Sequence, residues 1–470
     1  MKNLLFGAMA LLATVCYAQK SSGPTTPFVA AEIYQTNSFN MAQINQTEVP
    51  TGAATHYGRI RQKGFSNTAY TKQEGLRDYA VTKQFGLINN ADVYQFGNDN
   101  GVEVQQGRNN SWVLDNNIYV KQTGDDNCVI GKQFGNYNMA TVNQTGNLNY
   151  TKFRQNKDSN TLDVAQTGNL NTADVFQNRN YNQAYITQQS DFSTVDVDQR
   201  ESDDLAIIVQ SGLNHSARVL QDNTSSSSGN NSAIIAQFGD SHFSSVIQKG
   251  EFNSAQNTQT IGNNTSTMRQ VGGYNSATVG QNGDSDFSDL KQTGDQNLAT
   301  VDQNGDDNTS NLIQNGNQNF TVVDQLGDTN NSYSKQVGNN NLNRNIQTGD
   351  QNDVYSLQRG DYNLYESLQQ GDQNYAYSKQ IGNNNLNVSS QIGNSNYNRV
   401  NQRGDDNITD VEQIGNFNKN ETLQVGNMHQ VYVLQNGDLN CSKIEQTTNG
   451  PHLATVVQLG TSNTACIIQM

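Results

Sequence analysis

The sequence contains little proline and little apolar material. Only four of its 470 residues are proline, and none lies between Pro50 and Pro451. Hydrophobic residues make up 33% of the chain, and the mean hydropathy is -0.76. This excludes a single deep core and leaves either a disordered polar chain or a repeat structure with a thin core. The scarcity of proline favours the repeat structure, because disordered polar chains are often rich in proline whereas paired strands exclude it.

Basic residues are also scarce. The chain has 28 Lys and Arg against 43 Asp and Glu, which gives a net charge of -15. No run of Lys and Arg forms a phosphate-binding stripe, so we expect no nucleic-acid partner. The acidic excess is interpreted as solvated surface charge that keeps a β-rich chain soluble.

Long apolar stretches are confined to the N-terminus. Lys2 provides a positive start, Leu4 to Val15 an apolar stretch, and Ala18 a small residue for cleavage, which predicts a signal peptide over residues 1–18. A lipoprotein cleaved before Cys16 is an alternative, although bulky Val15 disfavours it. No later segment approaches the ~20 apolar residues of a membrane span, so we expect a secreted protein without membrane insertion.

Cysteines are too few for a disulfide framework. Cleavage after Ala18 leaves Cys128, Cys441 and Cys466, an odd number. Cys441 and Cys466 are candidates for pairing, which the sequence leaves open. No Cys/His cluster has the spacing of a zinc site.

What the sequence has in abundance is the motif Gln-x-Gly-x-x-Asn. From Gln237 to Gln435 a glutamine stands at every eleventh position, and a second unbroken run extends from Gln122 to Gln221. The pattern begins weakly at Gln35, so we expect a repeat region over 35–470. Extra residues interrupt it near 47–61, 107–121 and 222–236, and these are predicted to be loops on a repeating scaffold.

An 11-residue period also fits a right-handed helical coiled coil. A helix would then carry a glycine every three turns, at about 1 kcal/mol each relative to alanine, without capping or Leu/Ile seams. The strand interpretation fits better. With Gln as position 1, the glycine and the Asp or Asn after it tolerate left-handed turns, and positions 6, 8, 10 and the next Gln alternate to one side. In one repeat these are Asn297, Ala299, Val301 and Gln303, opposite Leu298, Thr300 and Asp302.

Two 11-residue halves then close one rung of 22 residues. The sequence predicts an all-β fold: a β-solenoid of stacked strand-turn-strand rungs with parallel, in-register strands. Stacked Gln and Asn side chains would form amide ladders, and glycine would allow the turn. The candidate self-assembly residues are Gln270, Gly272, Asn275, Gln292, Gly294, Asn297, Gln303, Gly305, Asn308, Gln314, Gly316, Asn319, Gln336, Gly338, Asn341, Gln358, Gly360, Asn363, Gln380, Gly382 and Asn385.

Catalytic chemistry has no support in the sequence. No nucleophile motif or phosphate loop occurs, so we expect no catalytic residues, cofactor or metal. Asp residues also recur every 22 residues, so stacked rungs would place like charges next to one another. Such a column either binds cations or is a screened acidic surface. His215, His242 and His429 replace the Asn at position 6 and are interpreted as ladder substitutes. The Asp column comprises Asp284, Asp306, Asp328, Asp350 and Asp372.

The motif resembles the curlin repeat of curli fibre subunits, bacterial functional amyloids. Gln292, Gly294, Asn297 and Ala299, followed by Gln303, match it position by position. The resemblance implies export through an outer-membrane secretion pore and self-assembly into biofilm matrix fibres. It also implies a nucleator subunit and assembly factors as partners, and a flexible secretion leader over residues 19–34. Unlike familiar curli subunits, this chain is long and carries the motif in both halves of the rung.

The alternative is a monomeric surface β-solenoid that acts as an adhesin or binding module. Monomeric solenoids usually have capped ends. Here Ala465, Ile467 and Gln469 continue the strand pattern to Met470 and leave an edge open for a partner. That favours a fibre-forming role.

Overall fold

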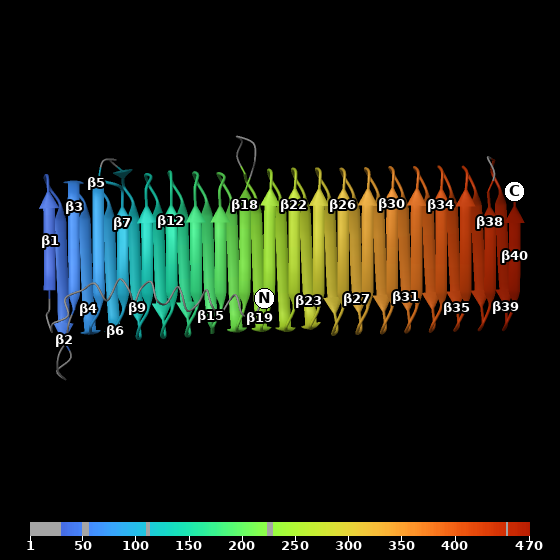
Figure 1. Cartoon of the computed structure of the whole chain (residues 1–470), viewed down its shortest axis with the longest axis horizontal. Helices are drawn as coiled ribbons and strands as arrows, with labels where there is room; N and C mark the ends of the chain where they lie inside the picture. Colours follow the sequence, from blue (N-terminus) through green and yellow to red (C-terminus); the bar gives the residue numbers. More distant parts are fainter. Residues whose placement is uncertain (1–29, 49–55, 110–112, 223–228, 448–449) are drawn as a thin grey trace. The chain divides into compact units, whose positions relative to one another are not determined.

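The computed structural model describes residues 30–48, 56–109, 113–222, 229–447 and 450–470, in which every regular element is a β-strand. The expected signal peptide and residues 19–29 of the expected leader lie outside the described residues. The chain divides into two compact units, which meet in sequence between Ser241 and His242. Each unit is a β-solenoid whose rungs alternate between two parallel sheets, A and B (Figure 1).

Unit 1 extends to Ser241. Its sheet A contains β1 (Ala30–Thr36), β3 (Tyr57–Phe65), β5 (Tyr79–Leu87), β7 (Gly101–Gln106), β8 (Val113–Leu114), β10 (Cys128–Gln133), β12 (Tyr150–Gln155), β14 (Thr172–Gln177), β16 (Thr194–Gln199) and β18 (Ser216–Asp222). Its sheet B contains β2 (Met41–Glu48), β4 (Thr68–Leu76), β6 (Asn90–Asn98), β9 (Asn117–Thr123), β11 (Met139–Thr145), β13 (Thr161–Thr167), β15 (Gln183–Asp191), β17 (Leu205–Leu213) and β19 (Ser232–Asp240).

Unit 2 begins at His242. Its sheet A contains β20 (Phe243–Lys249), β22 (Thr265–Val271), β24 (Phe287–Thr293), β26 (Thr309–Asn315), β28 (Asn331–Val337), β30 (Asp353–Arg359), β32 (Tyr375–Ile381), β34 (Tyr397–Arg403), β36 (Lys419–Val425), β38 (Cys441–Gln446) and β40 (Thr464–Gln469). Its sheet B contains β21 (Ser254–Gly262), β23 (Ser276–Asp284), β25 (Leu298–Asn304), β27 (Phe320–Leu326), β29 (Leu342–Thr348), β31 (Leu364–Gln370), β33 (Leu386–Ile392), β35 (Ile408–Ile414), β37 (Gln430–Asn436) and β39 (Leu453–Leu459).

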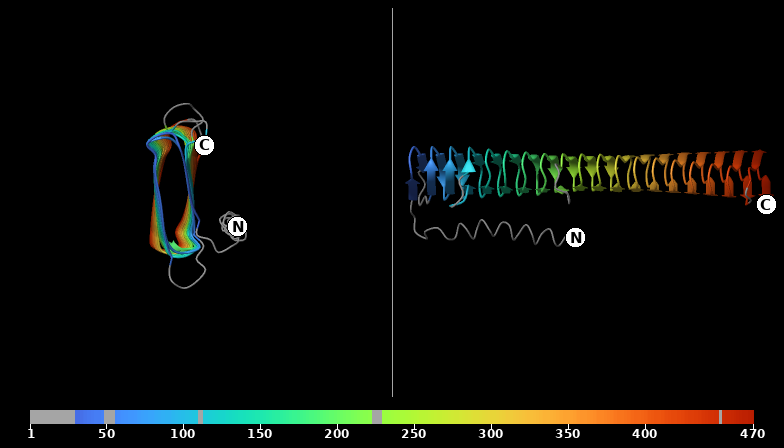
Figure 2. Two further views of the ribbon diagram at one scale, coloured as in Figure 1. Left: turned by 90° about the vertical axis from the view of Figure 1, so that its left-hand side faces the viewer. Right: turned by 90° about the horizontal axis from the view of Figure 1, so that it is seen from above.

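Neighbouring strands of each sheet pair in parallel and in register. Gln314 of β26 lies opposite Gln336 of β28, and Gln303 of β25 lies opposite Gln325 of β27. Each pair is 22 residues apart, so one rung consists of an A strand, a turn, a B strand and a second turn. Seen end on, a rung is a flattened loop with its two strands facing each other (Figure 2). The predicted all-β solenoid of parallel, in-register 22-residue rungs is confirmed.

Insertions lengthen a rung without shifting its register. Gln95 pairs with Gln122, and Gln210 pairs with Gln237, both 27 residues apart instead of 22. Strands begin inside the ranges expected to be loops: β3 within 47–61, β8 and β9 within 107–121, and β19 within 222–236. The insertions therefore leave the register of the strands on either side unchanged.

The core is one layer of side chains between the two sheets. Along each strand, buried and more exposed residues alternate, as in β26 and β30. In unit 1 the Phe153 ring fills space left by Gly131, where a Cβ would lie only 2.2 Å from that ring. In unit 2 part of the core is polar: the Asn345 amide donates to Ser332 Oγ at 3.0 Å across the sheets. A core this thin makes the hydrogen bonds between rungs a large share of the interactions that hold the fold.

Candidate self-assembly ladders

Glutamine at position 1 forms a buried ladder that joins successive rungs. Gln314 Nε2 donates to Gln336 Oε1 at 3.0 Å, and Gln336 Nε2 donates to Gln358 Oε1 at 2.9 Å. All three side chains are fully buried. In-register stacking makes this ladder possible, because it places identical amides near the ends of neighbouring strands, one strand spacing apart.

The second hydrogen of each amide joins the two sheets. Gln336 Nε2 also donates to the backbone carbonyl of Phe320 at 3.1 Å, where β27 of sheet B begins. Each interior glutamine therefore satisfies its donors completely, one along the stack and one across it. A buried amide is costly only when it lacks partners, so the ladder turns a polar residue into a structural link.

Asparagine at position 6 forms the complementary ladder at the turn. The Asn319 backbone N–H and Nδ2 both donate to Asn297 Oδ1, at 3.0 and 3.1 Å. Nδ2 also donates to the Gly338 carbonyl at 2.8 Å. One asparagine thus contacts the rung before it and the rung after it.

Glycine at position 3 is favoured by the close spacing between rungs. Gly316 has φ 122°, and a Cβ there would lie 2.0 Å from the carbonyl oxygen of Gly338 in the next rung. Any other residue would strain the backbone and also collide with the neighbouring turn.

The predicted ladder residues fall into columns. Those that belong to the turns after sheet A strands lie together, rung above rung, in unit 2: Gln270, Gln292, Gln314, Gln336, Gln358 and Gln380, with the Gly and Asn that follow each. Gln303, Gly305 and Asn308 lie instead in the column after sheet B strands, where Gln303 Nε2 donates to Gln325 Oε1 at 2.9 Å. The chain therefore has one set of ladders for each sheet.

A further ladder at position 4 was missing from the sequence prediction. The Asp306 backbone N–H donates to Asp328 Oδ1 at 2.9 Å, and the Asp295 N–H donates to Asn317 Oδ1 at 2.8 Å. The signal for it was the Asp or Asn that follows nearly every glycine, which we interpreted only as turn chemistry.

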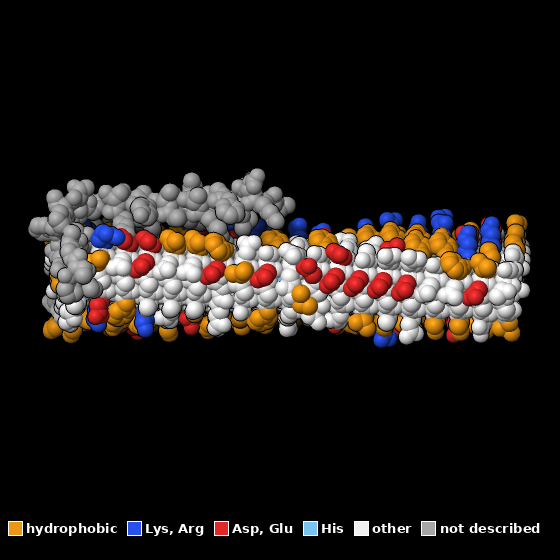
Figure 3. All heavy atoms as spheres, turned by 90° about the horizontal axis from the view of Figure 1, so that it is seen from below, with side chains coloured by type: hydrophobic (Ala, Val, Ile, Leu, Met, Phe, Trp, Pro, Cys, Tyr) orange, Lys and Arg blue, Asp and Glu red, His pale blue; other side chains and the backbone are white. Residues whose placement is uncertain are grey.

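This ladder explains the Asp column expected from the sequence. Asp284, Asp306 and Asp328 stack in one column in the turns after sheet B strands, and acidic side chains form a row there (Figure 3). The carboxylates of Asp306 and Asp328 each accept a hydrogen bond from a backbone N–H of the rung before, so backbone donors hold the column together. Within the described residues, no group of three His, Cys, Asp or Glu side chains is arranged to hold a metal ion.

Histidines occupy position 6 as expected. His215, His242 and His429 are buried there. The His429 N–H donates to Asn407 Oδ1 at 3.1 Å, as an asparagine in its place would. The His429 ring stacks on His452 with centroids 5.3 Å apart.

Aspartate also occupies position 6 in some rungs, and two of these residues, Asp204 and Asp286, carry perturbed pKa values. Burial raises the pKa of Asp204 and of Asp286 to about 7, although hydrogen bonds from Asn231 and Asn308 oppose the change. Asp286 Oδ1 accepts the Asn308 N–H at 2.9 Å, whereas its Oδ2 has no hydrogen-bond partner among the described residues. An ionised carboxylate lacks the donors that asparagine supplies at this position.

Tyrosines form stacks on the outward face of sheet A in unit 2. Tyr333, Tyr355 and Tyr377 lie on successive rungs with ring centroids 4.7 and 5.1 Å apart. Tyr375 and Tyr397 form a second stack, 5.0 Å apart. Cys441 and Cys466, on neighbouring strands β38 and β40, are free thiols, so the pairing left open by the sequence does not occur.

The end strands leave ladder groups unused. β40 pairs with β38 alone, and Ala465 and Ile467 are only partly buried. Gln469 Nε2 donates to Leu453 O at 3.2 Å, and the rest of its donor capacity has no partner among the described residues. In unit 1, Gln35 Nε2 donates to Gln62 Oε1 at 2.7 Å, while no described donor reaches Gln35 Oε1.

The geometry defines a class: a β-solenoid whose rungs are joined by side-chain amides as well as by backbone pairing. Two segments, residues 115–146 and 287–316, match the family model of the curlin associated repeat, and each spans three strands with their turns. None of the curated proteins compared with the chain matches it. These two segments are therefore similar to the curlin associated repeat. No helix in the described residues is long and apolar enough to cross a membrane.

Proposed function

We propose that this protein is a secreted structural subunit that self-assembles end to end into curli-like amyloid fibres of a biofilm matrix. The observation that carries the proposal is the complementarity of its end strands. Among the residues that the structure describes, Gln458 and Gln469 have donor capacity left at one end, and no donor reaches the side-chain oxygens of Gln35 and Gln46 at the other. Interior rungs join the same donor and acceptor at every step.

End-to-end growth would repeat the interior geometry. The N-terminal strands of one copy would add to β39 and β40 of another, in parallel and in register. Gln458 and Gln469 would donate to Gln46 and Gln35 of the next copy. Each addition also buries Ala465 and Ile467, which gives growth an apolar contribution. The fibre would therefore be polar, with one donor end and one acceptor end.

The similarity of two segments to the curlin associated repeat supports the remaining assignments. Curlin-repeat subunits are extracellular, which supports export by the expected signal peptide and a secretion leader over residues 19–34. An outer-membrane secretion pore, a nucleator subunit and assembly factors are the partners that belong to this proposal. The fibres would contribute to the biofilm matrix and to cell adhesion.

The test uses the purified mature chain, from residue 19 onward. We expect a lag followed by a rise of thioflavin fluorescence, and removal of the lag by preformed fibres. Fibre diffraction should give a reflection near ~4.8 Å along the fibre axis, the spacing between paired strands. A chain that stays monomeric for days, with the same folded β-structure, would instead favour a monomeric adhesin.

A further inference from the structure

We propose that the outward face of sheet A in unit 2 binds an anionic polysaccharide. The relevant surface, the cationic face, covers β28, β30, β32 and β34. It consists of five cations and five tyrosines: Lys335, Arg359, Lys379, Arg399, Arg403, Tyr333, Tyr355, Tyr375, Tyr377 and Tyr397. The proposal does not depend on fibre assembly, because every copy carries this face.

The cations of this face are not neutralised within the protein. Among the described residues, no carboxylate lies within 4.0 Å of the charged nitrogens of any of the five. On the outward positions of these four strands, Asp353 is the one acidic residue. A concentration of free positive charge is unexpected in a chain whose net charge is -15. It points to an anionic partner.

The opposite face of the same region has the opposite charge. The outward positions of β27, β29, β31, β33 and β35 carry Asp324, Glu366, Asp410 and Glu412, against a single cation, Arg344. Charge is therefore segregated between the two sheets. A partner recognised by charge would bind sheet A and be repelled by sheet B.

The tyrosine stacks favour a carbohydrate over single-stranded nucleic acid. Their rings lie 5–9° from parallel with centroids 4.7–5.1 Å apart, so each interior ring face is covered by its neighbour. Nucleobases bind single-strand proteins largely by stacking on open aromatic faces, which this surface can offer only at the ends of the two stacks. What remains exposed is ring edges and rows of phenol hydroxyls, which can exchange hydrogen bonds with sugar hydroxyls.

The tyrosines remain neutral hydrogen-bonding groups beside the cations. Burial raises the pKa of Tyr333, Tyr375 and Tyr377 above its usual value. The Arg399 guanidinium lies over the Tyr377 ring, 5.4 Å from its centroid. Arg399 is thereby held against the face.

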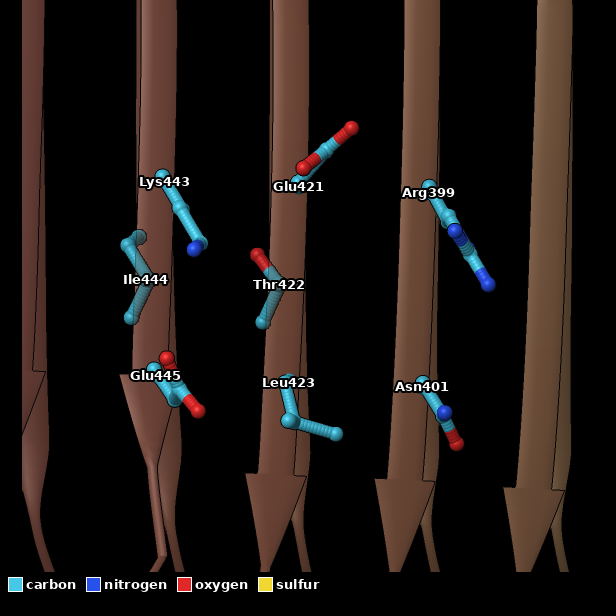
Figure 4. A pocket seen from close by; sticks show the side chains of 8 residues that line it. All are labelled: Arg399, Asn401, Glu421, Thr422, Leu423, Lys443, Ile444 and Glu445. Carbon is cyan, nitrogen blue, oxygen red and sulfur yellow. The ribbon is translucent and has the colours of Figure 1, made fainter.

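The surface is hollowed where this face meets β36 and β38. A pocket of about 230 Å³ lies there, and Arg399, Glu421 and Lys443 are among the side chains that line it (Figure 4). Glu421 is paired with Lys419 at 3.0 Å. We therefore place the end of the cationic face at β34, since beyond it acidic residues balance the basic ones.

The experiment measures binding of the full mature chain to labelled polygalacturonate by fluorescence anisotropy before assembly begins. Neutral dextran, oligothymidylate and phosphatidylglycerol vesicles are the comparison ligands. The test variant combines Arg359→Gln, Lys379→Gln and Arg403→Gln. We expect it to bind at least about tenfold more weakly, with the slope of log K against log salt reduced by about two to three, because three counterion-releasing contacts are lost.

A control variant places the same change in net charge on the opposite sheet: Thr278→Glu, Thr348→Glu and Ser390→Glu, all at outward positions. It should bind polygalacturonate within about twofold of the unmodified chain, because it leaves the contacts intact. Equal losses in both triple variants, or no loss in the first, would overturn the proposal. So would tighter binding of oligothymidylate or vesicles, or binding by the unmodified chain that is insensitive to salt.

Discussion

The side-chain amide of Gln314 donates a 3.0 Å hydrogen bond to that of Gln336, one rung away, and both residues are fully buried. Two residues 22 positions apart thus form a contact that recurs at every rung of the same ladder. The contact makes each rung a template for the next, which is the property that an elongating fibre end requires.

Replacement of one ladder glutamine tests this role. Gln314→Leu keeps the side chain bulky but removes the acceptor of the Gln292 amide and the donor to the Leu298 carbonyl, whereas Gln336 Oε1 still accepts from the Thr321 hydroxyl. Because each unsatisfied buried polar group costs about 1–3 kcal/mol, we expect the free energy of unfolding to fall by at least about 2 kcal/mol in urea titration. Gln370→Leu, at an exposed outward position, is the control and should change it by less than about 0.5 kcal/mol.

The glycine turn offers a second matched pair. Gly316→Ala places a Cβ 2.0 Å from the Gly338 carbonyl oxygen at φ 122°, so the turn must distort. We expect a loss of about 1–3 kcal/mol or more in the free energy of unfolding, measured by urea titration of circular dichroism. Gly273→Ala is the control, because the nearest atoms to its Cβ lie 3.6 Å away. Equal stability of the two variants would show that spacing between rungs does not require glycine.

The sequence was sufficient to predict the solenoid because the spacing of its repeats also determines which residues pair between neighbouring rungs. Gln, Gly and Asn recur together, and only stacking in register gives their amides partners. The turn conformation was less predictable. Position 5 adopts a left-handed conformation even in Thr329 and Tyr362, with φ 60° and 58°, although such residues disfavour it. The ladders on either side impose this conformation, so local preference gives no signal for it.

The cationic face escaped sequence analysis for a different reason. Arg359 and Arg403 are far apart in sequence, and no linear run of basic residues connects them. The fold brings them together because β30 and β34 each pair with β32. A search for contiguous charge cannot detect a stripe assembled from one residue per rung.

Asp286 should make stability depend on pH. Its folded-state pKa is about 7 against an ordinary 3.8, chiefly through desolvation. Between these values the folded chain holds the proton more tightly than the unfolded chain, so the free energy of unfolding falls as pH rises across that window and is level above it. Asp286→Asn restores the donors of the ladder, and we expect it to stabilise the chain by about 1–3 kcal/mol at pH 8.

The comparison is made by urea titration at pH 5 and pH 8. The difference between Asp286→Asn and the unmodified chain should be larger at pH 8 than at pH 5, because only the carboxylate ionises. Asp284→Asn, two residues earlier at the partly exposed end of β23 and at a position where Asn is common, is the control for the change in net charge. A stabilisation by Asp286→Asn that is the same at both pH values would rule out titration of this side chain as its cause.

The open edge of β40 provides a test of assembly that separates growth from folding. The N–H groups of Cys441, the first residue of β38, and of Thr447, the residue that follows the strand, donate to the carbonyls of Asn463 and Gln469. Because parallel strands alternate the direction of their backbone groups, the Ile468 N–H points away from β38 to the open edge. Ile468→Pro removes this donor and places a ring on the edge, where proline is tolerated within a folded sheet.

We expect the proline variant to keep the circular dichroism spectrum and urea midpoint of the unmodified chain and to elongate seeds at least about tenfold more slowly, because an edge that lacks a donor pairs poorly. Ile468→Thr, which keeps the N–H, should elongate at close to the normal rate. Preformed fibres extended in the presence of the proline variant should also stop growing at the end that exposes β40, since a copy added there presents a blocked edge. Undiminished growth of the proline variant would mean that fibres form by a contact other than the one that joins rungs within the chain.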